Sequence, residues 1–311
     1  MSILVENISK SYAKIQAVEA ISFNVKEGEL FGLIGPDGAG KTTIFRILTT
    51  LLIANQGTAT VAGFDVIKDY KAIRNSVGYM PGKFSLYQDL SVEENLTFFA
   101  TIFGTTIQEN YDLIKDIYIQ IEPFKNRRAG ALSGGMKQKL ALCCALIHKP
   151  KVLFLDEPTT GVDPVSRKEF WEMLKRLQQK GITILVSTPY MDEAALCDRI
   201  ALIQKGKILK IDSPENIISN YDKTIYNVRA KNIYQLIQDL KQIQHSTVFL
   251  PLVNTFIISM KKKILIVTIY RNILKIKITL KSKFTFHIQQ SKTFLWIYKQ
   301  ATDETDLNKI F

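Results

Sequence analysis

The sequence predicts an α/β protein with a mixed, largely parallel central sheet, an antiparallel β-subdomain, a helical subdomain and a basic C-terminal extension. The first observation is that the uninterrupted apolar runs Leu30–Ile34 and Val152–Leu155 read as strands buried on both faces, as in parallel sheets. The second is that Ile3–Ile8 and Ala20–Val25 indicate antiparallel strands ahead of this core. With 311 residues, the chain has the length of one medium domain plus an appendage.

The remaining elements follow in chain order. We expect a helix over Thr42–Leu52, a strand near Thr58–Ala62, and a strand that reads VGYMP. A mainly helical insert is predicted over about Val92–His148, and it contains the long uncharged run Asn95–Gln108. The core sheet then resumes, with Lys205-Gly206 as a hairpin turn between its last two strands. The strands predicted here are Val152–Leu155, Thr183–Ser187, Ile200–Ile203 and Lys207–Ile211.

The stretch GPDGAGKTT fits the G-x-x-x-x-G-K-[ST] phosphate-binding loop and lies, as this motif requires, between a strand and a helix. Its glycines allow successive backbone N–H groups to point at phosphate oxygens. Lys41 brings a point charge to the β- and γ-phosphates, and Thr42 offers a hydroxyl to Mg²⁺. The sequence thus predicts a P-loop NTPase core. The predicted nucleotide-binding residues are Gly35, Pro36, Asp37, Gly38, Ala39, Gly40, Lys41, Thr42 and Thr43.

A second motif, LSGGMKQ, begins at Leu132. Ser133 is a favourable N-cap, and Gly134 and Gly135 leave the first N–H groups of the next helix, about Gly135–His148, open to an anion. The two motifs together resemble the ATP-binding-cassette (ABC) ATPases, whose signature motif reads in this style. In that family, the signature of one subunit closes over the nucleotide held by the phosphate loop of a second. The resemblance implies ATP as the ligand and a dimer with a second copy or a related ATPase subunit.

The segment KVLFLDEPTTGVD places Asp156 and Glu157 at the carboxyl end of a strand, the usual ligand edge of an open α/β sheet. By resemblance, Asp156 is the Walker B carboxylate that holds Mg²⁺ through water, and Glu157 is the base that activates the attacking water. The residues Gly161-Val162-Asp163 match the family's D-loop. Asp163-Pro164 also reads as the N-cap and first residue of a helix that ends at Gly181.

Two further residues are predicted near the base of the nucleotide. The family places an aromatic residue about where Tyr12 stands, and its ring would stack on adenine, with Val18 as an aliphatic companion. The alternative is that Tyr12 is an edge-strand residue that packs on its neighbours.

The chain departs from the family at two positions. Gly82 stands where the Q-loop glutamine is expected, and Pro189 stands where the switch histidine is expected. Neither residue can offer the lost side chain to γ-phosphate, Mg²⁺ or the attacking water. Two readings follow: a working but slow ATPase, or an ATP-binding regulatory subunit with little turnover. We favour the ATPase, because Lys41, Asp156 and Glu157 are retained.

The rest of the sequence bears on partners and compartment. The three cysteines, Cys143, Cys144 and Cys197, are expected to be core residues of a protein in a reducing cytosol. No signal-like segment and no apolar run of about 18–20 residues is seen, so the membrane pathway would belong to another polypeptide. The resemblance implies that a permease docks on the helical insert near Phe84 and Tyr87. Phe98, Phe99 and Phe103 either belong to this groove or fill the core of the helical subdomain.

We divide the chain into an ABC nucleotide-binding domain, residues 1–220 with a helical subdomain at about 88–150, and a C-terminal extension, residues 221–311. Residues 249–311 carry 11 Lys and Arg against 3 Asp and Glu, which is +8 of the net charge of +12. LKIKITLKSKFTFHI within this extension alternates like an amphipathic strand. The extension either binds acidic lipid headgroups or is a diverged form of the family's small regulatory extension. No nucleic-acid module is recognised, and no nucleic-acid partner is expected.

The motifs run in the style of the ATPases of ABC-2-type exporters, including drug-resistance members. We therefore expect a subunit peripheral to the cytoplasmic face of the cell membrane, working beneath a separate ABC-2-type permease. The rival reading is a soluble ABC protein that acts on ribosomes or DNA. That class usually shows paired cassettes or a long coiled-coil insert, and this chain shows neither.

Overall fold

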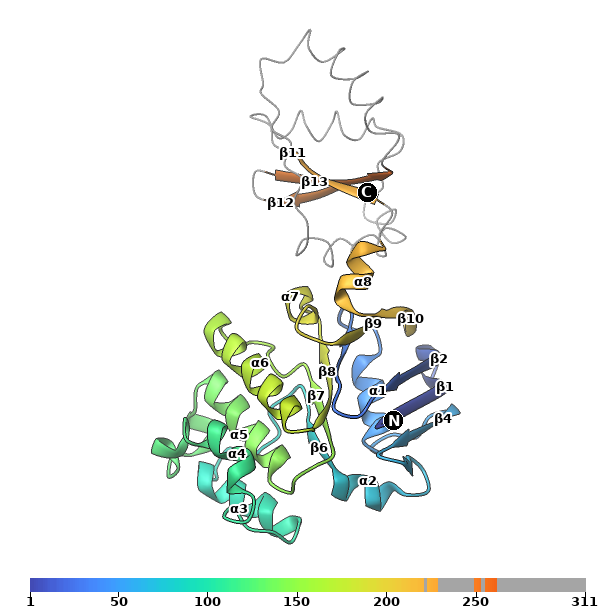
Figure 1. The fold of residues 1–311 in the computed structure, drawn as a ribbon. Helices are drawn as coiled ribbons and strands as arrows, with labels where there is room; N and C mark the ends of the chain where they lie inside the picture. Colours follow the sequence, from blue (N-terminus) through green and yellow to red (C-terminus); the bar gives the residue numbers. More distant parts are fainter. Residues whose placement is uncertain (221–222, 229–248, 253–254, 262–311) are drawn as a thin grey trace. The chain divides into compact units, whose positions relative to one another are not determined.

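The computed structural model describes residues 1–220, 223–228, 249–252 and 255–261. The chain divides into two compact units, Met1–Pro214 and Glu215–Phe311 (Figure 1). The first unit holds every predicted nucleotide-binding motif.

The central sheet of the first unit has six strands in the order β10-β9-β3-β8-β7-β6. β9, β3, β8, β7 and β6 run parallel, and β10 pairs antiparallel with β9. This arrangement confirms the prediction of a mixed, largely parallel sheet. The strands are β3 (Leu30–Ile34), β6 (Val77–Met80), β7 (Val152–Asp156), β8 (Thr183–Thr188), β9 (Arg199–Gln204) and β10 (Lys207–Asp212).

A second, antiparallel sheet has the order β2-β1-β4-β5. Its strands are β1 (Ile3–Tyr12), β2 (Ile15–Val25), β4 (Gln56–Val61) and β5 (Phe64–Asp65). Helix α1 (Lys41–Leu48) contacts β7 of the central sheet as well as β2 and β4 of this one. The Phe45 ring of α1 meets the Phe154 ring of β7 edge-on, with centroids 6.0 Å apart. Helix α1, which follows the phosphate loop, therefore packs against both sheets in the hydrophobic core.

The remaining helices of this unit are α2 (Tyr70–Ser76), α3 (Val92–Ile102), α4 (Tyr111–Tyr118), α5 (Gly134–Leu146), α6 (Pro164–Gln179) and the short α7 (Met191–Ala194). Two 3₁₀ turns, Glu122–Phe124 and Ala129–Ala131, lie between α4 and α5. Figure 1 shows α3, α4, α5 and α6 gathered on the side of the central sheet away from β1, β2 and β4. The helices of the predicted insert, α3, α4 and α5, thus lie together, with α6 beside them.

Two predicted helices are shorter than expected, for one physical reason. α1 ends at Leu48 instead of Leu52, because Thr50 takes a left-handed conformation (φ 62°) and the N–H of Leu51 returns to the carbonyl of Arg46. The run Asn95–Gln108 stops being helical after Ile102, where Gly104 (φ 65°) makes the same C-cap. In both cases, the 6→1 and 5→2 hydrogen bonds of a Schellman motif close the helix.

The second unit contains a three-stranded antiparallel sheet in the order β11-β13-β12. Its strands are β11 (Lys223–Val228), β12 (Phe249–Leu252) and β13 (Thr255–Lys261), and α8 (Pro214–Ser219) spans the boundary between the units. The predicted amphipathic strand LKIKITLKSKFTFHI, at residues 274–288, lies outside the described residues.

Two sequence expectations concern the chain as a whole. Cys143, Cys144 and Cys197 are buried free thiols, which confirms that they are core residues. In the part of the chain that the structure describes, no helix is both long and apolar enough to cross a membrane.

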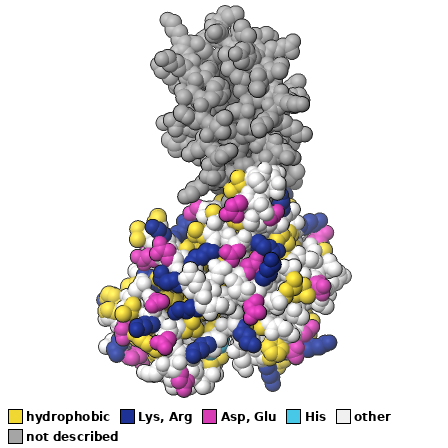
Figure 2. All heavy atoms as spheres, in the orientation of Figure 1, with side chains coloured by type: hydrophobic (Ala, Val, Ile, Leu, Met, Phe, Trp, Pro, Cys, Tyr) yellow, Lys and Arg dark blue, Asp and Glu magenta, His cyan; other side chains and the backbone are white. Residues whose placement is uncertain are grey.

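On the face drawn in Figure 2, Lys and Arg side chains of the first unit are interspersed with Asp and Glu. This face therefore presents mixed charge and not the continuous basic surface that nucleic acids favour.

Candidate nucleotide-binding site

The phosphate loop runs from the end of β3 to the start of α1, as its sequence predicts. The N-cap of α1 is Gly40, with φ 104°, and a Cβ there would lie 2.6 Å from the carbonyl oxygen of Ala17. Only glycine fits this left-handed, close-packed position. The loop therefore exposes backbone N–H groups at the start of a helix, where the helix dipole favours an anion.

Lys41, the central cation of the motif, is 3% exposed. Its Nζ donates to the carbonyls of Gly35 and Pro36, at 2.8 and 2.9 Å. The same Nζ forms an ion pair of 3.0 Å with Oε1 of Glu157. Two predicted catalytic residues, 116 positions apart in the numbering of the chain, are thus in direct contact.

Asp156 ends β7 and is 2% exposed. Burial raises the pKa of its carboxyl above the usual range, against the opposing effect of hydrogen bonds from the hydroxyls of Ser187 and Thr42. The Ser187 bond measures 2.6 Å. A buried carboxylate beside a threonine hydroxyl is the oxygen donor set that Mg²⁺ takes together with phosphate oxygens, so these two residues fit the predicted metal site.

The backbone of Glu157 is fixed just beyond β7. Its N–H is shared between the carbonyl oxygen and the hydroxyl of Ser187, at 3.1 and 3.0 Å. Its φ of 52° is unusual for a residue other than glycine. Because a strained conformation persists only where the surroundings hold it, the structure holds this carboxylate toward the phosphate loop.

These residues line an open pocket of about 830 Å³, large enough for a nucleotide. From the predicted set it contains Asp37, Gly38, Gly40, Lys41, Thr42, Thr43, Asp156 and Glu157. Gly35 and Pro36 serve the site through their carbonyls, and Ala39 is buried beneath the loop.

Gly82, which the sequence comparison with the family placed at this site, also lines the pocket. Sequence reasoning missed the other residues that share it: Ile15, Gln16, Ala17, Arg46, Leu51, Tyr79, Pro81 and Lys83. Burial and the nearby Asp156 raise the pKa of Tyr79 to about 12, so its phenol stays protonated. Arg46 carried a usable signal, since it follows Lys41 on the same short helix.

Besides Gly35, Pro36 and Ala39, five predicted residues do not line the pocket. Ser133 caps α5 by accepting a 3.4 Å hydrogen bond from the N–H of Met136, yet Ser133, Gly134 and Gly135 lie outside the described lining. Tyr12, at the end of β1, is 41% exposed and also lies outside it. Val18 is fully buried. The signature and the base-stacking residues therefore stay predictions.

The loop with Pro189 is held by a buried carboxylate. Glu193, 2% exposed, accepts hydrogen bonds from the hydroxyls of Thr159 (2.7 Å) and Thr188. Arg167 donates its Nε–H to the same carboxylate at 3.0 Å. This network ties the segment after Walker B to the loop that follows β8, so the position normally given to the switch histidine is structurally fixed.

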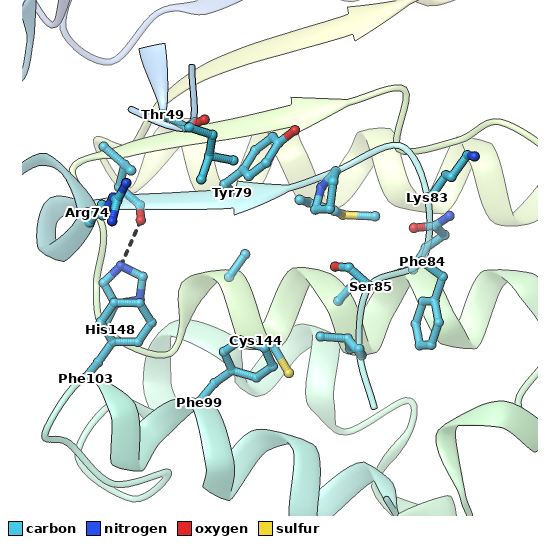
Figure 3. Close-up of a pocket in the computed structure, with 18 residues that line it drawn as sticks. Thr49, Arg74, Tyr79, Lys83, Phe84, Ser85, Phe99, Phe103, Cys144 and His148 are labelled. Atoms are coloured by element: carbon cyan, nitrogen blue, oxygen red, sulfur yellow. Dashed lines mark hydrogen bonds between the residues drawn. The ribbon is translucent and has the colours of Figure 1, made fainter. Parts of the chain in front are cut away.

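An apolar groove of about 320 Å³ lies beside the nucleotide pocket (Figure 3). Its walls come from β6, α3, α5 and the segment after β6, and they include Phe84, Leu86, Phe99, Phe103, Cys144 and His148. The His148 imidazole stacks on Phe103 at a centroid distance of 3.8 Å and hydrogen-bonds the carbonyl of Val77 at 3.1 Å. Burial lowers the pKa of His148. Phe99 and Phe103 thus face a groove and do not only fill the helical subdomain.

Comparison with known proteins shows which family the sequence matches. Residues 18–160 match the protein family described as ABC transporter. Over 214 residues, or 68% of the chain, the sequence is 40% identical to the probable multidrug ABC transporter ATP-binding protein YbhF of Escherichia coli (strain K12), and the match spans 37% of that relative's length. The linearmycin resistance ATP-binding protein LnrL of Bacillus subtilis (strain 168) is 36% identical over 217 residues, 69% of this chain and 70% of that protein.

The fold is also found among solved structures. The cbiO1 protein of Clostridium perfringens, described as part of the ABC transporter complex cbiONQ, superposes with a TM-score of 0.63 at 27% identity. The alignment covers 70% of this chain and 91% of that one. The matched part agrees in extent with the first compact unit.

Proposed function

The chain belongs to the family of ABC transporter ATP-binding proteins, and from this premise we propose that it is an ATP-hydrolysing subunit that dimerises on ATP and drives a separate membrane permease. The observation that carries the proposal is the convergence of Lys41, Asp156 and Glu157 on one pocket. These residues hold the phosphates, the metal and the attacking water in the chemistry of this family.

Each side chain has one task in this proposal. Lys41 binds the β- and γ-phosphates together with the loop N–H groups, and Thr42 and Asp156 would hold Mg²⁺. When bound, Mg²⁺ neutralises charge on the phosphates. Glu157 orients the attacking water and accepts its proton. In the structure, Lys41 pairs with Glu157 at 3.0 Å, so binding of ATP frees the carboxylate as phosphate takes its place on Lys41.

A second subunit would complete the site. The capped start of α5 is exposed at Ser133 and Gly134, and neither residue lines the pocket of its own chain. Free N–H groups at a helix start suit the γ-phosphate of a nucleotide on a partner subunit. The start of α5 packs closely on α6, because a Cβ at Gly135 would lie 2.7 Å from Oγ and 3.0 Å from Cβ of Ser166.

We propose that the permease is of the ABC-2 type, that it docks in the groove of Figure 3, and that the subunit lies at the cytoplasmic face of the membrane. The apolar walls of the groove support a docking role, since exposed apolar surface of this kind marks an interaction site. Export is supported by the drug-resistance names of the relatives.

A regulatory subunit with little turnover is the second candidate. One observation favours it: Gly82 has no side-chain amide and Pro189 has no imidazole to offer to the phosphates. The retained Lys41, Asp156 and Glu157 favour hydrolysis.

Sedimentation and ATP turnover distinguish the candidates. Glu157→Gln should bind ATP, form a dimer with Mg²⁺-ATP and lose turnover, whereas the matched control Glu172→Gln, on exposed α6 surface, should behave as wild type. Turnover should rise when the permease is added. The proposal fails if Glu157→Gln stays monomeric at saturating ATP while wild-type turnover does not depend on Glu157. Negligible turnover with the permease present would favour the regulatory subunit.

A further inference from the structure

The segment after β6 lies close to the backbone of Asp156 at the end of β7. A Cβ built on Gly82 would lie 3.0 Å from the carbonyl oxygen of Asp156 and 3.9 Å from Cβ of Glu157. Because the residue has no side chain, the backbone of this segment can lie against the end of β7. The next residue along the chain, Lys83, is therefore delivered to the rim of the nucleotide pocket.

The neighbours of Gly82 point in different directions. Figure 3 shows the side chains of Lys83 and Phe84 on opposite sides of the segment. Phe84 lies in the groove, with Nζ of Lys137 5.6 Å from its ring centroid. Lys83 lines the nucleotide pocket together with Lys41, Asp156 and Glu157, and also borders the groove. The packing of Phe84 thus fixes the segment with Lys83 at the pocket.

The charge of Lys83 is available to a ligand. It is exposed, and within the described residues it makes no hydrogen bond or ion pair. Lys41, by contrast, is buried and already bound to two carbonyls and Glu157. Arg46 also lines the pocket, but it lies five residues further along α1 and therefore about 7.5 Å from the phosphate end.

We propose that Lys83 is a catalytic residue that donates to the γ-phosphate as charge develops on it, in place of the side chain absent at Gly82. The proposal rests on the proposed function. Water forms a bond to the γ-phosphorus, the bond from that phosphorus to the bridging oxygen breaks, ADP leaves, and the proton of the water passes to Glu157. Lys83 donates hydrogen bonds to the phosphate oxygens and transfers no proton. An ammonium on a flexible four-carbon stem offers three donors and a full charge, so it can replace a neutral amide donor.

The test compares Lys83→Ala and Lys83→Arg with the control Lys115→Ala, an exposed lysine on α4. We expect Lys83→Ala to slow phosphate release about 10–100-fold, since one preorganised donor typically contributes that much or more. Binding of ADP with aluminium fluoride, which imitates the transferring phosphoryl group, should weaken by a similar factor, whereas ADP alone should change less than about threefold. Lys83→Arg should retain more activity than Lys83→Ala because it keeps the charge.

Two outcomes would overturn the proposal. One is that Lys83→Ala binds ADP with aluminium fluoride as tightly as Lys115→Ala does. The other is an equal loss of affinity for ADP and for ADP with aluminium fluoride, which would mean general attraction of the nucleotide. Wild-type turnover measured beside Glu157→Gln separates this test from the proposed function. If both release phosphate equally slowly, the proposed function fails, and the aluminium fluoride comparison still decides the role of Lys83.

Discussion

Restoring the family side chains at the two divergent positions tests how the site is completed. The changes are Gly82→Gln and Pro189→His, alone and together. A glutamine at 82 returns a ligand for Mg²⁺ and the attacking water, and a histidine at 189 returns a donor near the γ-phosphate. Gly82 follows β6 and Pro189 follows β8, and both strands pair in parallel with β7, whose carboxyl end carries Asp156.

The structure sets the size of the expected gain. One preorganised donor in the transition state contributes about 3–4 kcal/mol. Gly82→Gln also has a steric cost, because its Cβ would lie 3.0 Å from the carbonyl of Asp156, and overpacking of this kind typically costs about 1–3 kcal/mol. Because this crowding displaces the amide from its best position, we expect only part of the donor's contribution, about 1.4 kcal/mol of transition-state stabilisation, which corresponds to about tenfold in rate. The double variant should exceed either single variant without reaching their product, because Lys83 acts on the same phosphate.

The assay is phosphate release at saturating Mg²⁺-ATP, with nucleotide affinity measured in parallel. Gly82→Ala is the matched control, since it adds the crowding Cβ without the amide. We expect Gly82→Ala to be no faster than wild type and Gly82→Gln to be faster. Repeating Gly82→Gln in the Lys83→Ala background should give a larger gain. The reasoning is refuted if Gly82→Gln is no faster than Gly82→Ala in both backgrounds while ATP still binds.

Three further predictions concern stability and organisation. The pKa of His148 in the folded chain lies below its unfolded value of about 6.5, so the unfolded chain takes up the proton first as the pH falls. The free energy of unfolding therefore decreases as the pH drops below that value. His148→Phe should lose less stability than wild type between pH 7.5 and 5.5 in thermal unfolding. Asp163→Ala removes the N-cap of α6, which accepts from the N–H groups of Val165 (3.1 Å) and Ser166 (3.0 Å), and should cost about 1 kcal/mol in denaturant unfolding, while no change would show that the cap is dispensable. Truncation after residue 248 should leave ATP affinity unchanged by calorimetry, and loss of binding in a folded truncation would show that the extension completes the site.

Much of the fold was accessible from sequence because local signals agreed with the tertiary structure. The central strands read as apolar runs, and the helix from Pro164 was marked at both ends, by Asp163 and by Gly181. The early end of α1 was not accessible, because its C-cap uses Thr50 in a left-handed conformation where glycine is the usual signal. Arg74 of α2 donates to the hydroxyl and to the carbonyl of Thr50, and sequence alone does not show this contact.

The residues of the candidate site also divide into those that the sequence predicted and those that it did not. Lys41, Asp156 and Glu157 were predicted because their motifs state the chemistry directly. Lys83 was not, because the family resemblance placed only Gly82 of this segment at the site, and nothing in the order of residues shows that Lys83 also lines the pocket. The sequence showed that Gly82 lacks the expected ligand side chain. Only the structure showed that the close approach of this segment brings Lys83 to the pocket.

The most direct test of the account is the rate of phosphate release per chain, measured over a range of protein concentrations with Mg²⁺-ATP. If two copies complete each other's sites, the rate per chain rises with concentration before it levels off, and Glu157→Gln shows no release at any concentration. A rate per chain that is independent of concentration and unchanged by Glu157→Gln would contradict the account.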